Sequence, residues 1–219
     1  MTRRSTLILL LTLVFGTGAL AQQPIVTPHS NAPSAELEDP IEALMATGGQ
    51  QVAFGDKTLQ FSWVKSLPLR SDSNEVAWSS IDEGTLVGAV RLSANFPDIR
   101  GNTMKAGVYT LRYGIQPADG NHLGVSPYRE FLLLSPAAAD KSVGALGHDG
   151  TIAISKQTIG TTHPASWSLD PPLAAEAPAS ISTDDAGLVH VVFEVPVSRD
   201  GKDVGTLKFG LILKGQIQS

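Results

Sequence analysis

Short runs of alternating apolar and polar residues, separated by glycine and proline, dominate the chain from Gln51 onward. Leu59, Phe61 and Trp63 alternate with polar neighbours, which is the two-residue period of a half-buried strand. With 21 Gly and 14 Pro among 219 residues, the chain has the turn-rich composition of many-stranded proteins. These features predict an all-β fold, a single antiparallel β-sandwich with the jelly roll as one form, preceded by one short N-terminal helix.

Seven segments carry the strand pattern, and four of them form two predicted hairpins. The last hairpin closes through Asp200-Gly201, a pair that favours a type I′ turn. Pro196 has no backbone N–H, so it predicts a bulge or a sheet edge near that turn. The continuous apolar run at 131–134 predicts a strand buried on both faces. The predicted strands cover residues 52–54, 59–64, 86–94, 108–116, 128–135, 189–197 and 204–214, with further extended segments at 151–154 and 161–169.

The segment before these strands has a different composition. Residues 22–38 are polar and contain several prolines, which predicts a flexible leader. A short helix is expected next, with Asp39 as its cap and Pro40 at its first position. We therefore expect a signal segment (1–21), this leader and one β-sandwich domain (39–219).

The first 21 residues have the three parts of a secretory signal peptide. Arg3 and Arg4 precede an apolar run at 7–15, and Ala19-Leu20-Ala21 supplies the small residues of a cleavage site. The run is shorter than the roughly 20 apolar residues that span a bilayer, and no later run reaches that length. We expect cleavage after Ala21 and a soluble periplasmic or secreted product without a membrane span. The arginine pair also partly matches a twin-arginine signal, so both export routes stay open.

The composition argues against several classes of site and partner. The chain has no cysteine, so it has no disulfides, thiolate metal sites or cysteine nucleophiles, and it must fold around a hydrophobic core. Its formal net charge of −5 becomes more negative once Arg3 and Arg4 are removed. An acidic domain lacks the basic surface that phosphate binding requires, so we expect no nucleic-acid partner.

Three loops contain histidine, two of them beside aspartate, and they form a candidate metal or polar site. Imidazole and carboxylate groups ligate divalent ions, and they also pair as base and orienting acid. The same residues are common in ordinary turns, and the chain contains no H-E-x-x-H motif. No cofactor is therefore predicted, and a divalent metal is the alternative. The candidate residues are Asp119, His122, His148, Asp149 and His163.

Two tryptophans give a second candidate site. Trp78 and Trp167 have polar neighbours in the sequence, so they form a candidate aromatic platform for sugar rings. Burial is the alternative, because large aromatic side chains supply much of a core's buried area. Trp63 lies in the apolar phase of its strand and is expected in the core.

Two arginines lie within predicted strands. A strand arginine near a core usually has a carboxylate partner, so Arg112 and Arg129 predict structural ion pairs rather than an anion site. Glu130 points to the face opposite Arg129. The partner is therefore expected from elsewhere in the chain.

A quarter of the chain resembles a known group of proteins. The segments concerned are residues 87–92, the A-G-x-Y-T-L strand at 106–111, D-G-N-H at 119–122 and Y-R-E-F-L-L-L at 128–134. Together they resemble exported bacterial β-sandwich proteins of unknown function over residues 86–136. The resemblance implies the fold class and export, and it implies no activity.

These observations predict an exported envelope protein with a non-catalytic binding or structural role. The first alternative is an envelope enzyme with a loop-borne histidine–aspartate site, with or without a metal. The second alternative is a glycan-binding module that uses Trp78 and Trp167.

Overall fold

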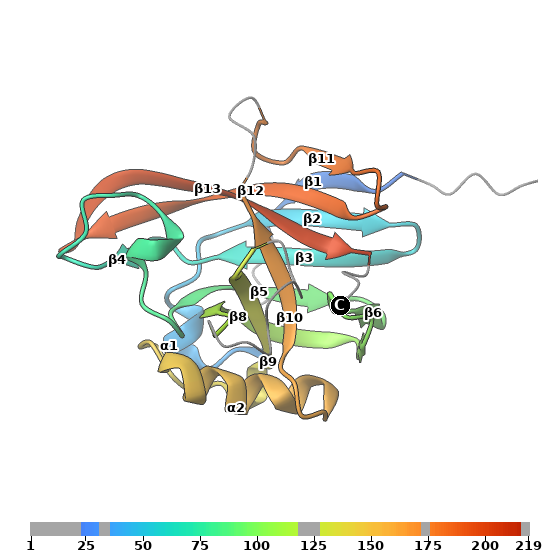
Figure 1. The fold of residues 1–219 in the computed structure, drawn as a ribbon, viewed down its shortest axis with the longest axis horizontal. Coiled ribbons are helices and arrows are strands. Elements are labelled where there is room, and N and C mark those ends of the chain that lie inside the picture. Colours follow the sequence, from blue (N-terminus) through green and yellow to red (C-terminus); the bar gives the residue numbers. More distant parts are fainter. Residues whose placement is uncertain (1–22, 31–35, 118–127, 172–175, 216–219) are drawn as a thin grey trace, which may run out of the picture.

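A computed structural model describes residues 23–30, 36–117, 128–171 and 176–215, so the signal segment lies outside the described residues. These residues form mainly β-strands and one long helix (Figure 1). The helical elements are α1 (Asp39–Glu42), η2 (Trp78–Ser80), η3 (Ala137–Ala139) and α2 (Gly147–Ile159). The strands are β1 (Ile25–His29), β2 (Gly49–Phe54), β3 (Lys57–Trp63), β4 (Leu67–Leu69), β5 (Leu86–Leu92), β6 (Phe96–Pro97), β7 (Thr103–Met104), β8 (Gly107–Ile115), β9 (Glu130–Pro136), β10 (Ala165–Asp170), β11 (Ile181–Thr183), β12 (Val189–Arg199) and β13 (Lys202–Lys214).

Most of these strands belong to one large curled sheet. Its strand order is β1-β2-β3-β5-β8-β9-β10-β13-β12-β11, and β4 adds a parallel pairing to β12 in an otherwise antiparallel sheet. A separate small hairpin pairs β6 with β7. Figure 1 shows the sheet turning back over itself, with α2 outside the curl and packed against β9.

The predicted antiparallel β-sandwich, including its jelly-roll form, is wrong because the strands do not separate into two sheets. β8, β9 and β10 pair one after another and carry the backbone hydrogen bonds from one half of the molecule to the other. The parallel pairing of β4 with β12 also makes the sheet mixed. Alternating side chains fill the inside of a curled sheet just as they fill the space between two sheets. The sequence pattern therefore predicts a mostly β chain correctly but does not distinguish the two arrangements.

A cluster of aromatic rings fills the inside of the curl. Phe61 and Trp63 on β3 each have a ring centroid 4.9 Å from that of Phe193 on β12. Trp63 also meets Phe209 of β13 edge-on at 5.3 Å. Five strands separate β3 from β12 in the sheet order, so these contacts show how far the sheet curls. Burying a side chain of this size stabilises the fold by roughly 1.5–3 kcal/mol relative to leaving it exposed.

The N-terminal segment differs from the expected flexible leader, because part of it forms β1 and pairs with β2. Pro28 fits there since β1 is at the edge of the sheet, where a missing N–H is tolerated. The expected short helix is a single turn, α1, with Pro40 in its first turn and Ile41 buried. Its N-cap residue is Glu38 rather than Asp39, and no side chain caps it.

The helix α2 replaces the extended segment expected at 151–154. Its β-branched residues favour a strand locally, but contacts with the sheet outweigh that preference. Ser155 Oγ donates to the carbonyl oxygens of Leu134 and Ala165 at 2.7 and 2.9 Å. Thr158 Oγ1 also donates to Leu134, at 2.7 Å. Because α2 covers the outer face of β9, the centre of β9 is buried on both faces, as predicted.

Both predicted hairpins are confirmed, with β2 pairing to β3 and β12 to β13. Asp200 and Gly201 have φ values of +52° and +74°. A type I′ turn requires positive φ at both central residues, and this turn joins the two strands of the long hairpin. The pairing of β12 with β13 shifts register between Val197 and Ser198. This irregularity adjoins Pro196 and is the predicted bulge.

Arg112 is fully buried in β8, and its charge is matched by Asp140, which is equally buried. Nε and Nη2 donate to the two carboxylate oxygens at 2.7 and 2.8 Å. Nη1 donates to the carbonyl oxygens of Gly84 and Gly144 at 2.7 and 2.9 Å, and Nη2 also donates to that of Ser142. The partner of Arg112 therefore lies between η3 and α2, and this ion pair is structural, as predicted. Arg129, for which a carboxylate from elsewhere in the chain was expected, instead donates to the carbonyl oxygen of Gln116.

We expect Asp140→Asn to lower the free energy of unfolding by about 3–5 kcal/mol, because Arg112 would keep a buried charge without a counter-ion. Chemical denaturation followed by tryptophan fluorescence measures this loss. Glu36→Gln is the matched control, since it breaks the exposed Arg91–Glu36 pair and should cost no more than about 1 kcal/mol. If Asp140→Asn costs as little as the control, the structural role of the buried pair is refuted.

Candidate functional site

The predicted histidine and aspartate residues do not meet at one point in the described part of the chain. His148 and Asp149 lie in the first turn of α2, and His163 lies in the exposed loop beyond its last turn. The helix between them has 13 residues and is therefore about 20 Å long. Within the described ranges, no group of three His, Asp or Glu side chains is arranged to hold a metal ion. Asp119 and His122 lie outside those ranges.

The two candidate platform tryptophans lie in different environments. Trp167 is fully buried, and its Nε1 donates to the carbonyl oxygen of Pro97 at 3.3 Å. Trp78 is half-buried, stacks on Tyr113 at 5.1 Å and meets Phe209 edge-on at 5.3 Å. Because one ring is inside the core and the other packs against it, this arrangement does not support a shared sugar platform.

Glu83 is the partner of His148, and the turn that carries Glu83 docks on the start of α2. Oε1 of Glu83 accepts hydrogen bonds from Nδ1 of His148 at 2.8 Å and from the backbone N–H of Ile115 at 3.0 Å. The carbonyl oxygen of Glu83 accepts the N–H of Gly147 at 3.1 Å. Gly84 has a φ of +84°, and a Cβ there would lie 2.5 Å from the nitrogen of Gly147. Glycine is therefore required for this close approach.

The Glu83–His148 pair borders a shallow pocket of about 310 Å³ that also contains Arg129 and Gln116. Nε2 of His148 has no hydrogen-bond partner among the described residues. When a carboxylate accepts a hydrogen bond from one ring nitrogen of a histidine, the other ring nitrogen can act as a base or as a metal ligand. Arg129 donates from Nε and Nη2 to the carbonyl oxygen of Gln116, at 3.2 and 2.8 Å. The pocket thus combines one oriented imidazole with a guanidinium group, two of whose nitrogens already donate hydrogen bonds to the backbone.

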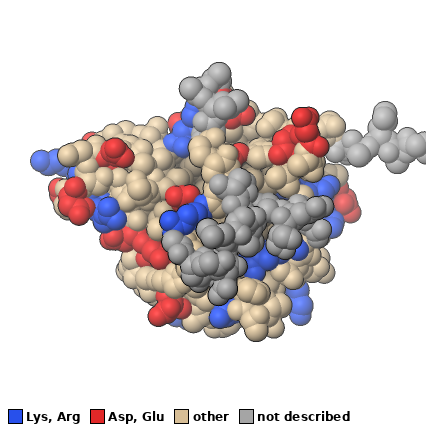
Figure 2. All heavy atoms as spheres, viewed as in Figure 1, with Lys and Arg blue, Asp and Glu red and all other residues tan. Residues whose placement is uncertain are grey.

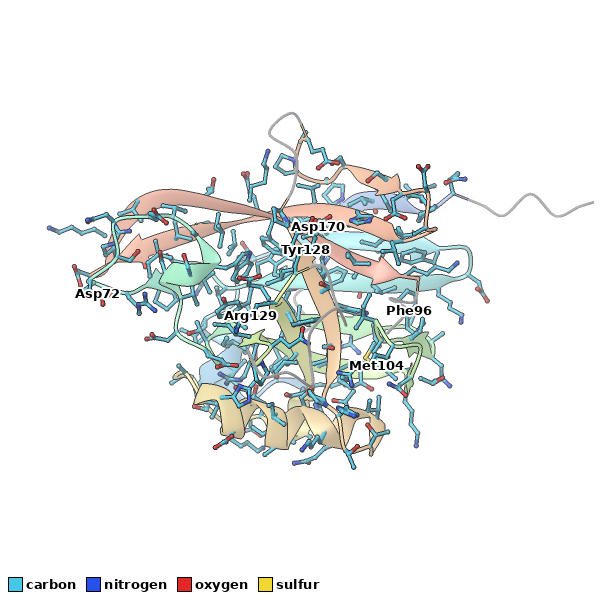
Figure 3. The ribbon with its side chains drawn as sticks, viewed as in Figure 1. Asp72, Phe96, Met104, Tyr128, Arg129 and Asp170 are labelled. Carbon is cyan, nitrogen blue, oxygen red and sulfur yellow. The ribbon has the colours of Figure 1, made fainter. Side chains whose placement is uncertain are left out.

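A second carboxylate–imidazole cluster joins β10 to β12. The Nδ1 and Nε2 atoms of His190 lie 2.6 and 3.3 Å from carboxylate oxygens of Asp170 and Asp184. The side chain of Tyr128 is hydrogen-bonded to Asp170, and Figure 3 shows the two residues close together near β10. Burial, followed by this carboxylate, raises the pKa of Tyr128. Because both ring nitrogens of His190 are occupied, the cluster links structural elements rather than offering a base.

A groove of about 740 Å³ lies beside the C-terminal end of α2. One wall is formed by residues 103 and 105–109, which lead into β8. The other wall is formed by residues 136–138 around η3 and by the end of α2 at 157–160, with Glu36 at the rim. Most lining side chains are apolar, and the volume lies within the range of roughly 300–1,000 Å³ that small-molecule sites occupy.

Hydrogen bonds hold the walls of this groove in place. Oδ1 of Asp98 accepts the N–H of Asn102 at 2.7 Å, which fixes the turn between β6 and β7. Tyr109 donates its hydroxyl to the carbonyl oxygen of Lys105 at 2.8 Å. Burial raises the pKa of Tyr109, so the hydroxyl keeps the proton that it donates. Gly160 ends α2 in the left-handed conformation, with its N–H donating to Lys156. The groove is therefore built from ordered elements on both sides.

The groove has an uneven charge. Lys105 is the one cationic side chain among the described lining residues, and it is exposed without an ion-pair partner in the described part of the chain. Glu36 already pairs with Arg91, with 2.7 Å between Oε1 and Nη1. The uncompensated charge at the groove is therefore positive.

The rest of the surface is mixed in character. On the face drawn in Figure 2, acidic and basic side chains of the described residues are interspersed rather than gathered into one patch. Large exposed apolar residues such as Ile25 and Val143 are scattered. Within the described ranges, no helix has both the length and the apolar character needed to cross a membrane.

Comparison with protein families, curated proteins and solved structures gives no match for this chain. The sandwich fold that the resemblance of residues 86–136 implies is corrected by the single curled sheet, and its implication of export stays a prediction. The groove and the two carboxylate–imidazole clusters are the features of the described residues that bear on function.

The sequence points to His148 and Arg129 but not to Glu83, Asp170 or His190. Glu83 is 65 positions from His148, and its local sequence does not indicate a partner. The Asp170–His190 pair likewise joins strands that are distant in the chain. The one sequence feature that marks Lys105 is its position directly before the A-G-x-Y-T-L strand that carries the resemblance.

We expect the stability contributed by the charge of Asp184 to depend on pH. The N–H of Leu188 is the main cause that lowers the pKa of Asp184 below its ordinary value of 3.8, and His190 adds to it. A carboxyl group whose pKa is lowered by folding stabilises the protein above its unfolded pKa, and this contribution is lost as the pH falls through the folded pKa. Asp184→Asn keeps the side-chain acceptor and removes the charge, so it should be less stable than wild type at pH 7.

Denaturation series at falling pH measure this effect. The difference in the free energy of unfolding between wild type and Asp184→Asn should become smaller as the pH falls below about 4, where the carboxyl group begins to protonate. Asp185→Asn, at the exposed neighbouring position, is the control and should show no such difference. If the difference in the free energy of unfolding between wild type and Asp184→Asn stays constant as the pH is lowered from 7 into the acid range, the proposed role of the charge is contradicted.

Proposed function

We propose that this chain is an exported, non-catalytic binding protein that holds a small apolar ligand in the groove beside the end of α2. Export is inferred from the signal-like pattern of residues 1–21. The single observation that carries the binding role is the groove itself, with its volume of about 740 Å³ and its mainly apolar lining. Pockets of this size and lining are the usual sites of small ligands.

The chemistry of the lining favours binding over catalysis. Among the described residues that line the groove there is no histidine, serine or cysteine to act as base or nucleophile. The polar side chains of Tyr109 and Thr158 already donate to backbone carbonyl oxygens. A ligand here would be held by apolar contact and by a few polar groups at the rim.

Filling the groove with a large side chain tests this proposal. Ala138 is exposed and lines the groove, so Ala138→Trp should occupy it. The neutral apolar dye Nile red should bind wild type with one-to-one stoichiometry, and Ala138→Trp should weaken it roughly tenfold or more because the space is filled. Dye fluorescence titration measures both affinities.

The matched control is Ala153→Trp, which places the same side chain on the exposed side of α2 outside the groove. It should bind the dye as wild type does. Failure of wild type to bind Nile red, or equal weakening in both variants, would overturn the proposal.

One observation favours the alternative of an envelope enzyme with a histidine site. Glu83 orients His148 and leaves its Nε2 without a partner among the described residues, as in carboxylate-supported metal ligands and bases. Elemental analysis of protein purified without chelators separates the two functions. We expect no stoichiometric metal. A stoichiometric divalent metal that is lost in His148→Gln and kept in His163→Gln would favour the enzyme.

A further inference from the structure

We propose that the ligand of the groove is an amphiphile with one anionic group, which pairs with Lys105. This inference rests on the proposed function and specifies the chemistry of the same site. It follows from the charges around the groove, since apolar contact alone selects no charged group.

The first step concerns the cation. Lys105 is exposed at the wall of the groove, and within the described residues it has no ion-pair partner. Its carbonyl oxygen accepts the hydroxyl of Tyr109 at 2.8 Å, so the backbone that carries the side chain is fixed while the ammonium group is free. An ammonium group on a flexible side chain, carried by a fixed backbone, can reach an anion of a bound molecule.

The second step concerns the carboxylate at the rim. Glu36 would repel an anionic ligand, but its charge is compensated by Arg91 at 2.7 Å. The Arg91 side chain does not line the groove, so this pair leaves Lys105 as the uncompensated charge that a ligand meets. Charge complementarity therefore favours an anion over a cation or a neutral molecule.

The third step concerns the rest of the ligand. Among the apolar residues of the lining, Ala106 and Ala138 are exposed, and Pro136 and Ile159 are partly exposed. Such a surface gains free energy by covering an apolar chain, about 0.8 kcal/mol for each buried methylene group. A molecule that satisfies both the lining and Lys105 combines a hydrocarbon body with a single negative end.

Displacement of Nile red by three probes with the same hydrocarbon chain tests this inference. The probes are dodecanoate, methyl dodecanoate and dodecyltrimethylammonium, with the two ionic probes used below their critical micelle concentrations and the ester below its solubility limit. Dodecanoate should displace the dye from wild type at about one-fifth of the concentration that the ester requires, the factor expected for an exposed ion pair. This preference should shrink at about 0.5 M salt, because screening weakens the pairing.

Substitution of the lysine gives the decisive comparison. Lys105→Gln should remove the preference for dodecanoate while leaving the affinity for the ester unchanged, and Lys105→Glu should shift the preference to dodecyltrimethylammonium. Lys202→Gln, at the exposed tip of the β12–β13 hairpin, is the control and should keep the wild-type order.

The outcomes separate the two proposals. If the dye binds in the groove and all three probes displace it equally, whatever stands at position 105, the anionic ligand is refuted and the binding function stands. If wild type binds neither the dye nor any probe, the proposed function fails, and this inference fails with it.

Discussion

Arg112 of β8 holds a positive charge inside the core, and its partners lie in two separate connections. A guanidinium group inside a core is tolerated only when its donors are satisfied and its charge is matched. Asp140 supplies the charge, and the carbonyl oxygens of Gly84, Ser142 and Gly144 accept the remaining bonds. These partners come from the turn before β5 and from the loop that leads into α2. One side chain of β8 therefore determines where two connections run and where α2 can begin.

The curled sheet follows from a similar requirement on its apolar side chains. Phe61, Trp63 and Phe193 must be buried, and a flat sheet would leave one of its faces in water. Curling brings β3 against β12 and β13, so the sheet covers its own inner face. The outer face of β9 is still apolar, and α2 covers it. The helix is therefore needed to bury the outer face of β9, even though its own sequence favours a strand locally.

The elements with local signals could be predicted from the sequence, and those fixed by distant partners could not. The Asp200-Gly201 turn and the bulge beside Pro196 depend on backbone geometry that neighbouring residues impose, and both were predicted. The single curled sheet was missed because strand alternation has the same period in one sheet or two. The helix was missed because Ser155 bonds to carbonyl oxygens on β9 and β10. The pairing of Glu83 with His148 was missed for the same reason, since contact across 65 positions leaves no local pattern.

The two ends of α2 differ in chemistry, and this difference bears on how the groove would select a ligand. At its start the helix is held by polar contacts to Glu83, and near its end Ser155 and Thr158 attach it to β9. Because both ends are attached, the fold itself fixes the groove wall, and a ligand would bind with little ordering of the chain. A preformed site loses less free energy on binding than one that must first close. Selectivity would then depend on the shape of the wall and on the charge of Lys105 rather than on a closing movement.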